Sequence, residues 1–138
     1  MSNGLPEGYK TDPGFDPAED YIGPFYYAVS TPNQYAFVAD DKHCNANGIV
    51  HGGVLMAFAD YALCMAATNH YQGESCVTVS FNCEFVAAAQ INDLIGSTVT
   101  VTRKTGSMVF LTGIVRVSDT IVMTFSAVVK RLIEKAGQ

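Results

Sequence analysis

The sequence of 138 residues is poor in charge, above all in basic charge. Charged residues make up 15% of the chain, and eight lysines and arginines stand against thirteen acidic residues, which leaves a net charge of −5. This balance argues against a nucleic-acid backbone or an anionic membrane as the main partner, because both attract basic surfaces. Since 49% of the residues are apolar, we also expect an oligomeric partner to cover part of the surface.

The chain also lacks any apolar run of the roughly 20 residues that a membrane-spanning helix needs. Residues 1–20 are polar and rich in glycine, proline and aspartate, unlike a secretory signal. We therefore expect a cytoplasmic protein. The length fits one domain whose core needs no disulfide or metal. We expect an N-terminal arm over residues 1–15 and a single domain over residues 16–138.

The four cysteines form no Cys-x-x-Cys pair, so the sequence predicts neither a metal site nor a redox motif. Three of them, Cys64, Cys76 and Cys83, lie in apolar helix or strand patterns, which favours buried free thiols. Cys44 adjoins His43, but no third group that could orient a Cys–His pair is evident. A nucleophilic cysteine is therefore disfavoured.

The stretch from Val54 to Ala67 is apolar on every face of a helical period, and Asp60 is its only charged residue. This pattern is typical of a helix surrounded by protein. An unpaired carboxylate buried there costs several kcal/mol or raises its pKa. Asp60 therefore either bonds a neighbouring donor as a structural residue or faces a cleft, where it would be a catalytic candidate.

His51, Gly52 and Gly53 open this helix. The N–H groups of a first helical turn have no intrahelical partner and lie at the positive end of the helix dipole, so they can bind an anion or a developing oxyanion. The alternative for two glycines is a tight turn packed against a sheet. Asn45, a few residues upstream, adds a side-chain amide that could donate to the same oxygen.

Gly52 and Asp60 are eight residues apart, which places them roughly 12 Å apart along a helix axis. They cannot comfortably act on one carbonyl group within the same chain. If both act on one substrate, the simplest arrangement is a two-fold dimer in which Gly52 and Asn45 of one subunit face Asp60 of the other.

The remaining chain predicts strands and turns. Asp16 and Pro17 favour a short helix up to residue 22, and two short strands are expected over residues 25–29 and 34–39. From Ser75 the period changes from 3.6 to 2. Four further strands are expected over residues 76–85, 93–104, 107–117 and 121–132. These elements predict an α+β fold, a curved antiparallel sheet of about six strands wrapped round one long buried helix.

The motif His43-x-Asn45-x-x-Gly48-x-x-His51-Gly52-Gly53, followed seven residues later by Asp60, resembles the signature of hotdog-fold acyl-CoA thioesterases of the phenylacetate-pathway (PaaI-like) subfamily. The resemblance extends from Gly23 to about Val129. It implies the hotdog fold, an acyl-CoA substrate and no cofactor, because coenzyme A is part of the substrate. It also implies a homodimer, with dimers pairing into a homotetramer, and no metal, nucleic acid or membrane as partner.

The resemblance further implies roles for single residues. Gly52 and Asn45 would stabilise the charge that develops on the thioester oxygen, and Asp60 of the neighbouring subunit would act as general base or as nucleophile. Thr78 would position Asp60 or the water, although a surface strand threonine is the alternative. His51 would orient the loop or polarise the substrate from its edge.

Substrate contacts are expected from further positions. Gly53 lies beside the oxyanion site, and the bulky Tyr61 and Met56 near Asp60 would narrow the acyl or aryl pocket. The basic residues Arg103 and Lys104, near the turn at residues 105–106, could meet the phosphates of coenzyme A or serve as solvated edge charges, and Arg116 shares these two alternatives. Asn82 and Glu84 are expected on the same strand face as Thr78, as solvent or substrate-channel residues.

Two alternative functions remain at this point. A hotdog hydratase or dehydratase would act on enoyl or hydroxyacyl thioesters, but the chain lacks the Asp-x-x-x-x-His arrangement of those relatives. A non-catalytic acyl-CoA binding protein would keep the pocket without turnover.

Overall fold

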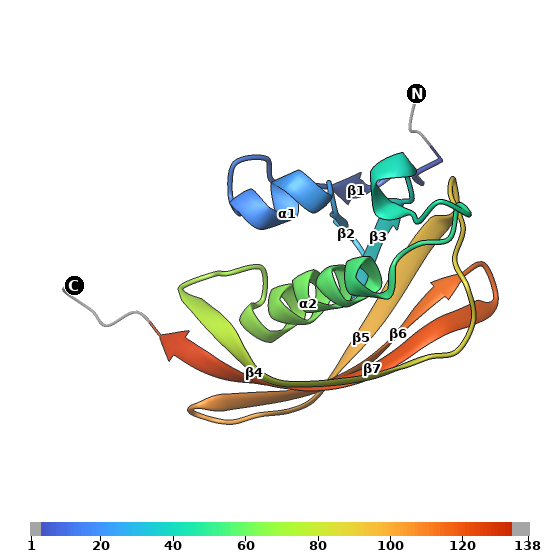
Figure 1. Ribbon diagram of the computed structural model, residues 1–138. Coiled ribbons are helices and arrows are strands. Elements are labelled where there is room, and N and C mark those ends of the chain that lie inside the picture. The colour runs from blue at the N-terminus through green and yellow to red at the C-terminus, as the bar shows by residue number, and fades with distance from the viewer. Residues whose placement is uncertain (1–3, 134–138) are drawn as a thin grey trace.

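The computed structural model describes residues 4–133. A long helix, α2, lies across one face of a curved antiparallel sheet, and the short helix α1 lies on the other side of α2 (Figure 1). The elements in chain order are β1 (Tyr9–Lys10), α1 (Pro17–Ile22), β2 (Tyr26–Ala28), β3 (Gln34–Val38), a 3-10 turn (Asp41–His43), α2 (Gly52–Thr68), β4 (Glu74–Phe85), β5 (Leu94–Lys104), β6 (Met108–Val117) and β7 (Thr120–Ile133).

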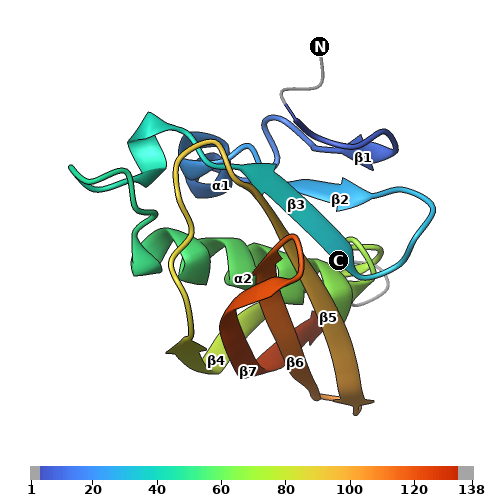
Figure 2. The same ribbon diagram turned by 90° about the vertical axis from the view of Figure 1, so that its right-hand side faces the viewer.

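The sheet has seven strands in the order β1-β2-β3-β5-β6-β7-β4, and every neighbouring pair is antiparallel. Figure 2 shows how it curves from the N-terminal strands round to β4. The predicted α+β fold is confirmed, with one strand more than expected. The additional strand, β1, falls within the segment predicted as an arm, where Tyr9 and Lys10 pair with β2. Residues 1–3 of that arm, and residues 134–138 of the domain, lie outside the described residues.

Helix α2 begins two residues before the predicted stretch and ends at Thr68, and the next residue, Asn69, adopts the left-handed conformation that commonly closes helices. Its apolar side chains fill the space between the sheet and the N-terminal elements. Phe58, Ala62 and Leu63 are fully buried there. No helix within residues 4–133 is long and apolar enough to cross a membrane.

One stripe of α2 departs from the prediction that protein covers every face of this helix. Gly53 and Met56 are exposed, and Ala57 and Asp60 are only half-buried. These four positions recur at helical spacing and therefore share one face. Within residues 4–133, β4 touches this face only at Asp60, through Thr78, and Gly53 and Met56 are left open to solvent.

Strand β4 contains a register shift between Thr78 and Ser80 that reverses the face on which later residues lie. Thr78 points toward α2, as its contact with that helix demonstrates. Asn82 instead lines a shallow hollow on the outer face of the sheet, and Glu84 accepts a hydrogen bond from Thr124 of β7. The prediction that Asn82 and Glu84 share the face of Thr78 is therefore wrong, because it assumed an unbroken pleat.

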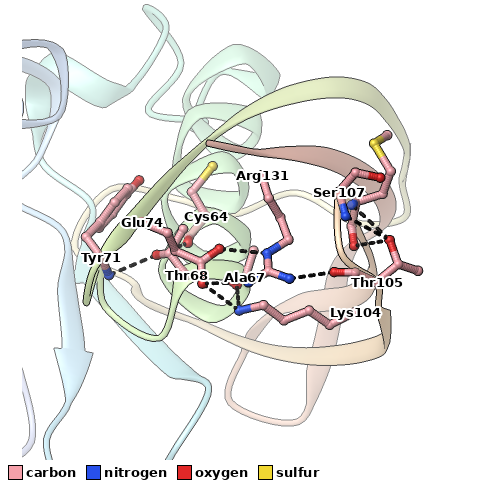
Figure 3. A network of polar contacts seen from close by, with 10 residues as sticks. Cys64, Ala67, Thr68, Tyr71, Glu74, Lys104, Thr105, Ser107 and Arg131 are labelled. Atoms are coloured by element: carbon pink, nitrogen blue, oxygen red, sulfur yellow. Dashed lines mark hydrogen bonds and ion pairs between the residues drawn. The ribbon is translucent and has the colours of Figure 1, made fainter. Parts of the chain in front are cut away.

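The C-terminal end of α2 is tied to the sheet by a polar network around Glu74 (Figure 3). Arg131 of β7 donates to Glu74 at 2.9 Å, and Lys104 of β5 pairs with it at 3.1 Å. Lys104 also donates to the carbonyl oxygen of Ala67, one of the last in the helix, at 2.8 Å. A cation is favourable at this end of a helix dipole, so the network anchors the helix as well as the strands.

The strand glycine Gly113 provides a test of this packing. A Cβ atom added at Gly113 would lie 2.7 Å from Cε1 of Phe125, its partner on β7. Phe125 is buried and stacks on Phe81, so its ring cannot yield easily. We expect Gly113→Ala to lower the free energy of unfolding by about 1–3 kcal/mol, as overpacking does, measured by urea denaturation.

Gly96 is the matched control, because a Cβ there would lie 3.7 Å from the nearest heavy atom, an ordinary contact. Gly96→Ala should stay within about 0.5 kcal/mol of the wild type. Equal stability of the two variants would contradict the packing described here.

Candidate active site

Asp60 and Thr78 form a direct hydrogen bond where α2 passes over β4. The Thr78 hydroxyl donates to Oδ1 of Asp60 at 2.6 Å. The thiol of Cys64, one turn further along α2, lies 3.9 Å from the same Oδ1 and 3.6 Å from Oγ1 of Thr78. Because Asp60 is only half-buried and its second oxygen has no hydrogen bond within residues 4–133, the carboxylate can act on a group that enters from the open side.

A second carboxyl group, that of Glu19 on α1, lies on the other side of α2. It lines a small cavity together with Phe25, Tyr61 and Met65. Burial, together with the negative charges of neighbouring aspartates such as Asp16 and Asp60, raises the pKa of Glu19 to about 7.

The N-terminus of α2 presents free donors to its surroundings. His51 is the N-cap residue and makes no capping hydrogen bond with its side chain, and the N–H groups of Gly52 and Gly53 donate to no acceptor within residues 4–133. The ring of Phe85 lies against Gly52, where an added Cβ would come within 2.9 Å of its Cζ atom. Nothing lies within 4 Å of the corresponding position at Gly53. Gly52 must therefore lack a side chain because the ring of Phe85 lies so close, whereas Gly53 is under no such constraint.

The loop before α2 holds Asn45 in a defined orientation. Its Oδ1 accepts hydrogen bonds from the backbone N–H groups of Asn47 at 2.9 Å and Ile49 at 3.1 Å. The side-chain oxygen is thus occupied, and the amide nitrogen of this exposed side chain is left to donate outward.

His43 anchors the same loop from beneath. It is buried, its Nδ1 accepts from the backbone N–H of Asp40, and its Nε2 lies within hydrogen-bond distance of the Ile22 carbonyl oxygen. Because one ring nitrogen accepts and the other faces a carbonyl oxygen, the ring is in the neutral form with a proton on Nε2. This histidine holds the loop against α1.

The structure brings the predicted site residues together in two groups. Gly52, Gly53, Asn45 and His51 gather at the N-terminus of α2, whereas Asp60 and Thr78 lie two turns further along, as the spacing predicted. Within one chain the two groups stay apart.

The residues predicted to contact the substrate lie in different environments, some in the core or in ion pairs and some on the surface. Tyr61 is buried, and its ring packs 5.4 Å from that of Phe25 and 5.9 Å from that of Tyr35, so it belongs to the core beside Asp60. Lys104 is held by Glu74 and by the end of α2, which satisfies its ammonium group within the fold. Arg103 is exposed on β5, and Arg116 donates to Thr98.

Sequence reasoning missed three residues around the site. The i, i+4 spacing of Asp60 and Cys64 is a signal that could have placed this thiol beside the carboxylate. The acidic run of α1 could have drawn attention to Glu19. The contact of Phe85 with Gly52 joins residues far apart in the chain, and no local pattern indicates it.

These features define a class of protein: a hotdog fold whose central helix carries a hydrogen-bonded carboxylate and a free, glycine-containing N-terminus. A family model described as the thioesterase superfamily matches residues 47–124, more than half of the chain. The chain therefore belongs to the thioesterase superfamily, and this membership supports thioester hydrolysis as its reaction.

The comparisons with individual proteins agree. PA0474 of Pseudomonas aeruginosa, which carries a provisional esterase name, is 34% identical over 92 residues, 64% of this chain and 69% of the relative. The thioesterase HI1161 of Haemophilus influenzae superposes with a TM-score of 0.77 at 12% identity, over 90% of this chain and 89% of that one. The E. coli PaaI protein of the phenylacetic acid degradation operon superposes with a TM-score of 0.76 at 16% identity, over 86% of each chain. The fold is that of PaaI-type hotdog proteins.

The raised pKa of Glu19 makes stability depend on pH. A carboxyl group whose pKa is about 7 in the folded state and 4.5 otherwise contributes stability below pH 4.5 that is lost as the pH rises through about 7. We expect Glu19→Gln to raise the free energy of unfolding at pH 8 by about 1–2 kcal/mol, once solvent screening is allowed for. The gain should vanish toward pH 4.5, as urea denaturation at each pH would measure.

Glu7 is exposed, so Glu7→Gln is the matched control for the same substitution at the partly buried Glu19. Glu7→Gln should produce no difference that grows between pH 4.5 and pH 8. A Glu19→Gln difference that is constant over this range would contradict the assigned ionisation.

Proposed function

We propose that this protein is an acyl-CoA thioesterase, which hydrolyses an acyl-CoA thioester to free coenzyme A and a carboxylic acid. One observation carries the proposal: Thr78 holds one oxygen of the Asp60 carboxylate, and the other oxygen accepts no hydrogen bond from the part of the chain that the structure describes. In a superfamily of thioesterases, a carboxylate fixed in this way is the group best placed to deliver water or to attack the thioester.

The N-terminus of α2 supplies the complementary half of the site. The thioester oxygen accepts hydrogen bonds from the N–H of Gly52 and from the outward amide of Asn45, whose orientation the two backbone donors to Oδ1 fix. Both donors are in place before the reaction, so they stabilise the oxyanion without reorganisation. Gly53 would meet the substrate through its backbone beside them, and His51 borders this site from the N-cap position.

Asp60 then acts by one of two routes. As general base, it takes a proton from water while the oxygen of that water adds to the carbonyl carbon. The tetrahedral intermediate collapses by breaking the C–S bond, and the proton passes to the departing thiolate. As nucleophile, its oxygen attacks the carbonyl carbon, the C–S bond breaks and coenzyme A leaves as the thiolate; water then opens the resulting mixed anhydride, which releases the carboxylic acid and restores Asp60. In either route, Thr78 fixes the carboxylate so that its free oxygen faces the substrate.

The two halves meet across a homodimer. The uncovered stripe of α2 that ends at Asp60, with Met56 39% exposed, gives a second copy an apolar face to cover. Strand β4 is the edge of the sheet and presents Val77 and Val79, 47% and 54% exposed. A two-fold axis beside these features brings Gly52 and Asn45 of one subunit toward Asp60 of the other. We extend the proposal to a tetramer made of two such dimers.

Coenzyme A requires cationic contacts for its phosphates. Since Lys104 is engaged at the end of α2, the exposed Arg103 is the better candidate of the two. Tyr61 limits the acyl pocket from the core side of Asp60, next to Phe25 and Met65.

Asp60→Asn tests the reaction directly. The substitution preserves shape but removes the base and nucleophile, so we expect kcat to fall by at least about a hundredfold. Release of free thiol from short, medium, long and phenylacetyl-type CoA thioesters, followed with a chromogenic disulfide, would measure it. Size-exclusion chromatography should give the same oligomer for both proteins.

Undiminished kcat in this variant would refute the role of Asp60. Tight binding of acyl-CoA without release of thiol by the wild type would instead favour a binding protein, and hydration of crotonyl-CoA would favour a hydratase.

The paired glycines test the oxyanion site. In Gly52→Ala the new methyl group must displace the ring of Phe85 or shift the first turn of α2, so we expect kcat/KM to fall by about tenfold to a hundredfold. Gly53→Ala meets no atom within 4 Å. This variant should keep a kcat/KM near that of the wild type. Its free energy of unfolding should rise by up to about 1 kcal/mol, because alanine has a better helix propensity than glycine.

A further test separates the two explanations for Gly52→Ala. If displacement of the ring alone is responsible, Phe85→Ala combined with Gly52→Ala should recover most of the lost kcat/KM. Equal losses in Gly52→Ala and Gly53→Ala would contradict the special position of the first glycine.

A further inference from the structure

The short helix α1 covers a cavity on the side of α2 that faces away from the sheet (Figure 1). With about 20 Å³ of free space, the cavity holds about one water molecule. Its core side is formed by Phe25, Tyr61 and Met65. Its outer side includes Phe15 and Glu19, which belong to the segment that carries α1. A small movement of this segment would therefore enlarge the cavity.

The segment from Gly14 to Gly23 is held together by its own hydrogen bonds. The side chain of Asp16 accepts from the backbone N–H of Glu19 at 3.0 Å, and that of Asp20 accepts from the N–H of Gly14 at 2.8 Å. The N–H of Gly23 donates to the carbonyl oxygen of Glu19 at 2.7 Å. No residue of α1 is buried. The segment can therefore move as a unit without breaking these bonds.

The C-terminal end of this segment is anchored to the loop before α2. Lys42 donates to the carbonyl oxygen of Tyr21 at 3.2 Å, and His43 holds the carbonyl oxygen of Ile22. Because His43 is itself buried, this end is fixed to the body of the fold and can serve as a pivot.

The N-terminal end is held by one pair of aromatic rings, Phe15 and Tyr71, which we call the latch. The two ring centroids lie 4.9 Å apart, yet Phe15 is 58% exposed. The preceding Gly14 has a φ of +85° and nothing within 4 Å of the position of a Cβ atom. A glycine in open space leaves the backbone free to rotate. This end can therefore lift when the latch separates.

A charged Glu19 opposes the closed position of this segment. Its side chain is half-buried in the cavity. The charged groups that face it are all acidic, namely Asp12 before α1, Asp16 and Asp20 at α1, and Asp60 on α2. Burial and these charges give the Glu19 carboxyl its pKa of about 7. When the segment lifts, water solvates the carboxylate, so a rise in pH through about 7 favours the open position.

The remaining titratable groups near Glu19 do not offset this charge. Tyr61 lines the cavity from α2, and Tyr71 lies in the turn that follows α2. Burial raises the pKa of both phenols, so they stay uncharged near neutral pH. Within residues 4–133, no lysine, arginine or histidine lines the cavity. Lys42 touches only the anchored end of the segment.

We propose that the segment from Gly14 to Gly23 is a lid, which pivots at Ile22 and opens the cavity to bulky acyl groups when Glu19 is charged. The role of the lid in substrate choice rests on the proposed function. Tyr61 lines the cavity and directly follows Asp60 on α2, so the open cavity extends the acyl pocket on the core side of the carboxylate. The closed cavity, with room for about one water, admits no acyl group. Long-chain and phenylacetyl-type groups therefore need the open lid, whereas short acyl groups do not.

A tryptophan placed in the latch tests the movement of the lid, because the chain contains no other tryptophan. In Phe15→Trp the indole ring packs against Tyr71 while the lid is closed and enters water when the lid opens. We expect its quenching by acrylamide to increase at least about twofold between pH 6 and pH 8, the range in which Glu19 loses its proton. Adding Glu19→Gln should keep the quenching at its pH 6 level throughout.

Two further variants serve as controls. Tyr21 lies on the same helix, 84% exposed and outside the cavity, so Tyr21→Trp should be strongly quenched at both pH values. Phe15→Trp combined with Tyr71→Ala should also be strongly quenched at both, because the latch is absent. Quenching of Phe15→Trp that is independent of pH would overturn the proposed lid. A pH response that survives either Glu19→Gln or Tyr71→Ala would overturn it as well.

Substrate choice gives the second readout. The kcat/KM for a long-chain or phenylacetyl-type CoA thioester is divided by that for acetyl-CoA, which cancels the pH dependence of the shared chemical step. This ratio should rise by up to about tenfold from pH 6 to pH 8 in the wild type and stay constant in Glu19→Gln. A constant ratio in the wild type would overturn the role of the lid in substrate choice. If no thioester is hydrolysed at all, the proposed function fails, while the tryptophan result still decides the lid.

Discussion

A carboxylate in the middle of an apolar helix needs a hydrogen-bond donor, and the hydroxyl of Thr78 meets this need for Asp60. This contact constrains its surroundings. Helix α2 must cross the sheet so that Asp60 faces β4, and β4 must turn Thr78 inward while it stays paired with β7. The network around Glu74 holds the next turns of the helix against the same strands. The relative position of Asp60 and Thr78 therefore depends on how α2 packs against the sheet.

The same helix explains why so small a protein is so rich in apolar residues. Three of its sides belong to the core, while the fourth, marked by Met56 and Ala57, is left to solvent in the single chain. Asp60 lies at the end of that fourth side, between buried packing and an open surface. In the proposed dimer, this face of α2 would therefore serve both as the subunit interface and as one wall of the active site.

Much of this arrangement could be predicted from the sequence. The apolar stretch after Gly53 and the alternating segments after Ser75 fixed the number and order of the main elements, because each has a clear period. The proximity of Asp60 and Thr78 followed from the family resemblance and is present in the structure. What could not be predicted depends on register or on contacts across the fold. One extra residue in β4 reversed the faces expected for Asn82 and Glu84.

Charged side chains were the other source of error. Lys104 could be assigned to a ligand or to solvent, but its real partners, Glu74 and a carbonyl oxygen of α2, come from distant parts of the chain. Glu19 was visible only as one of several acidic residues in α1, and its environment depends on how that helix packs over Tyr61. Single-sequence patterns describe local periodicity, and these contacts are not local.

The register shift in β4 has an evolutionary consequence. Deleting one residue between Thr78 and Ser80 would restore a regular pleat, but Cys76 and Thr78 would then turn outward if the later part of the strand kept its pairing. The position of the hydroxyl is thus encoded by the length of the strand as well as by the identity of the residue. Among descendants of this gene, insertions and deletions here should be rarer than substitutions, and an alignment that ignores the shift would match the wrong residue to Thr78.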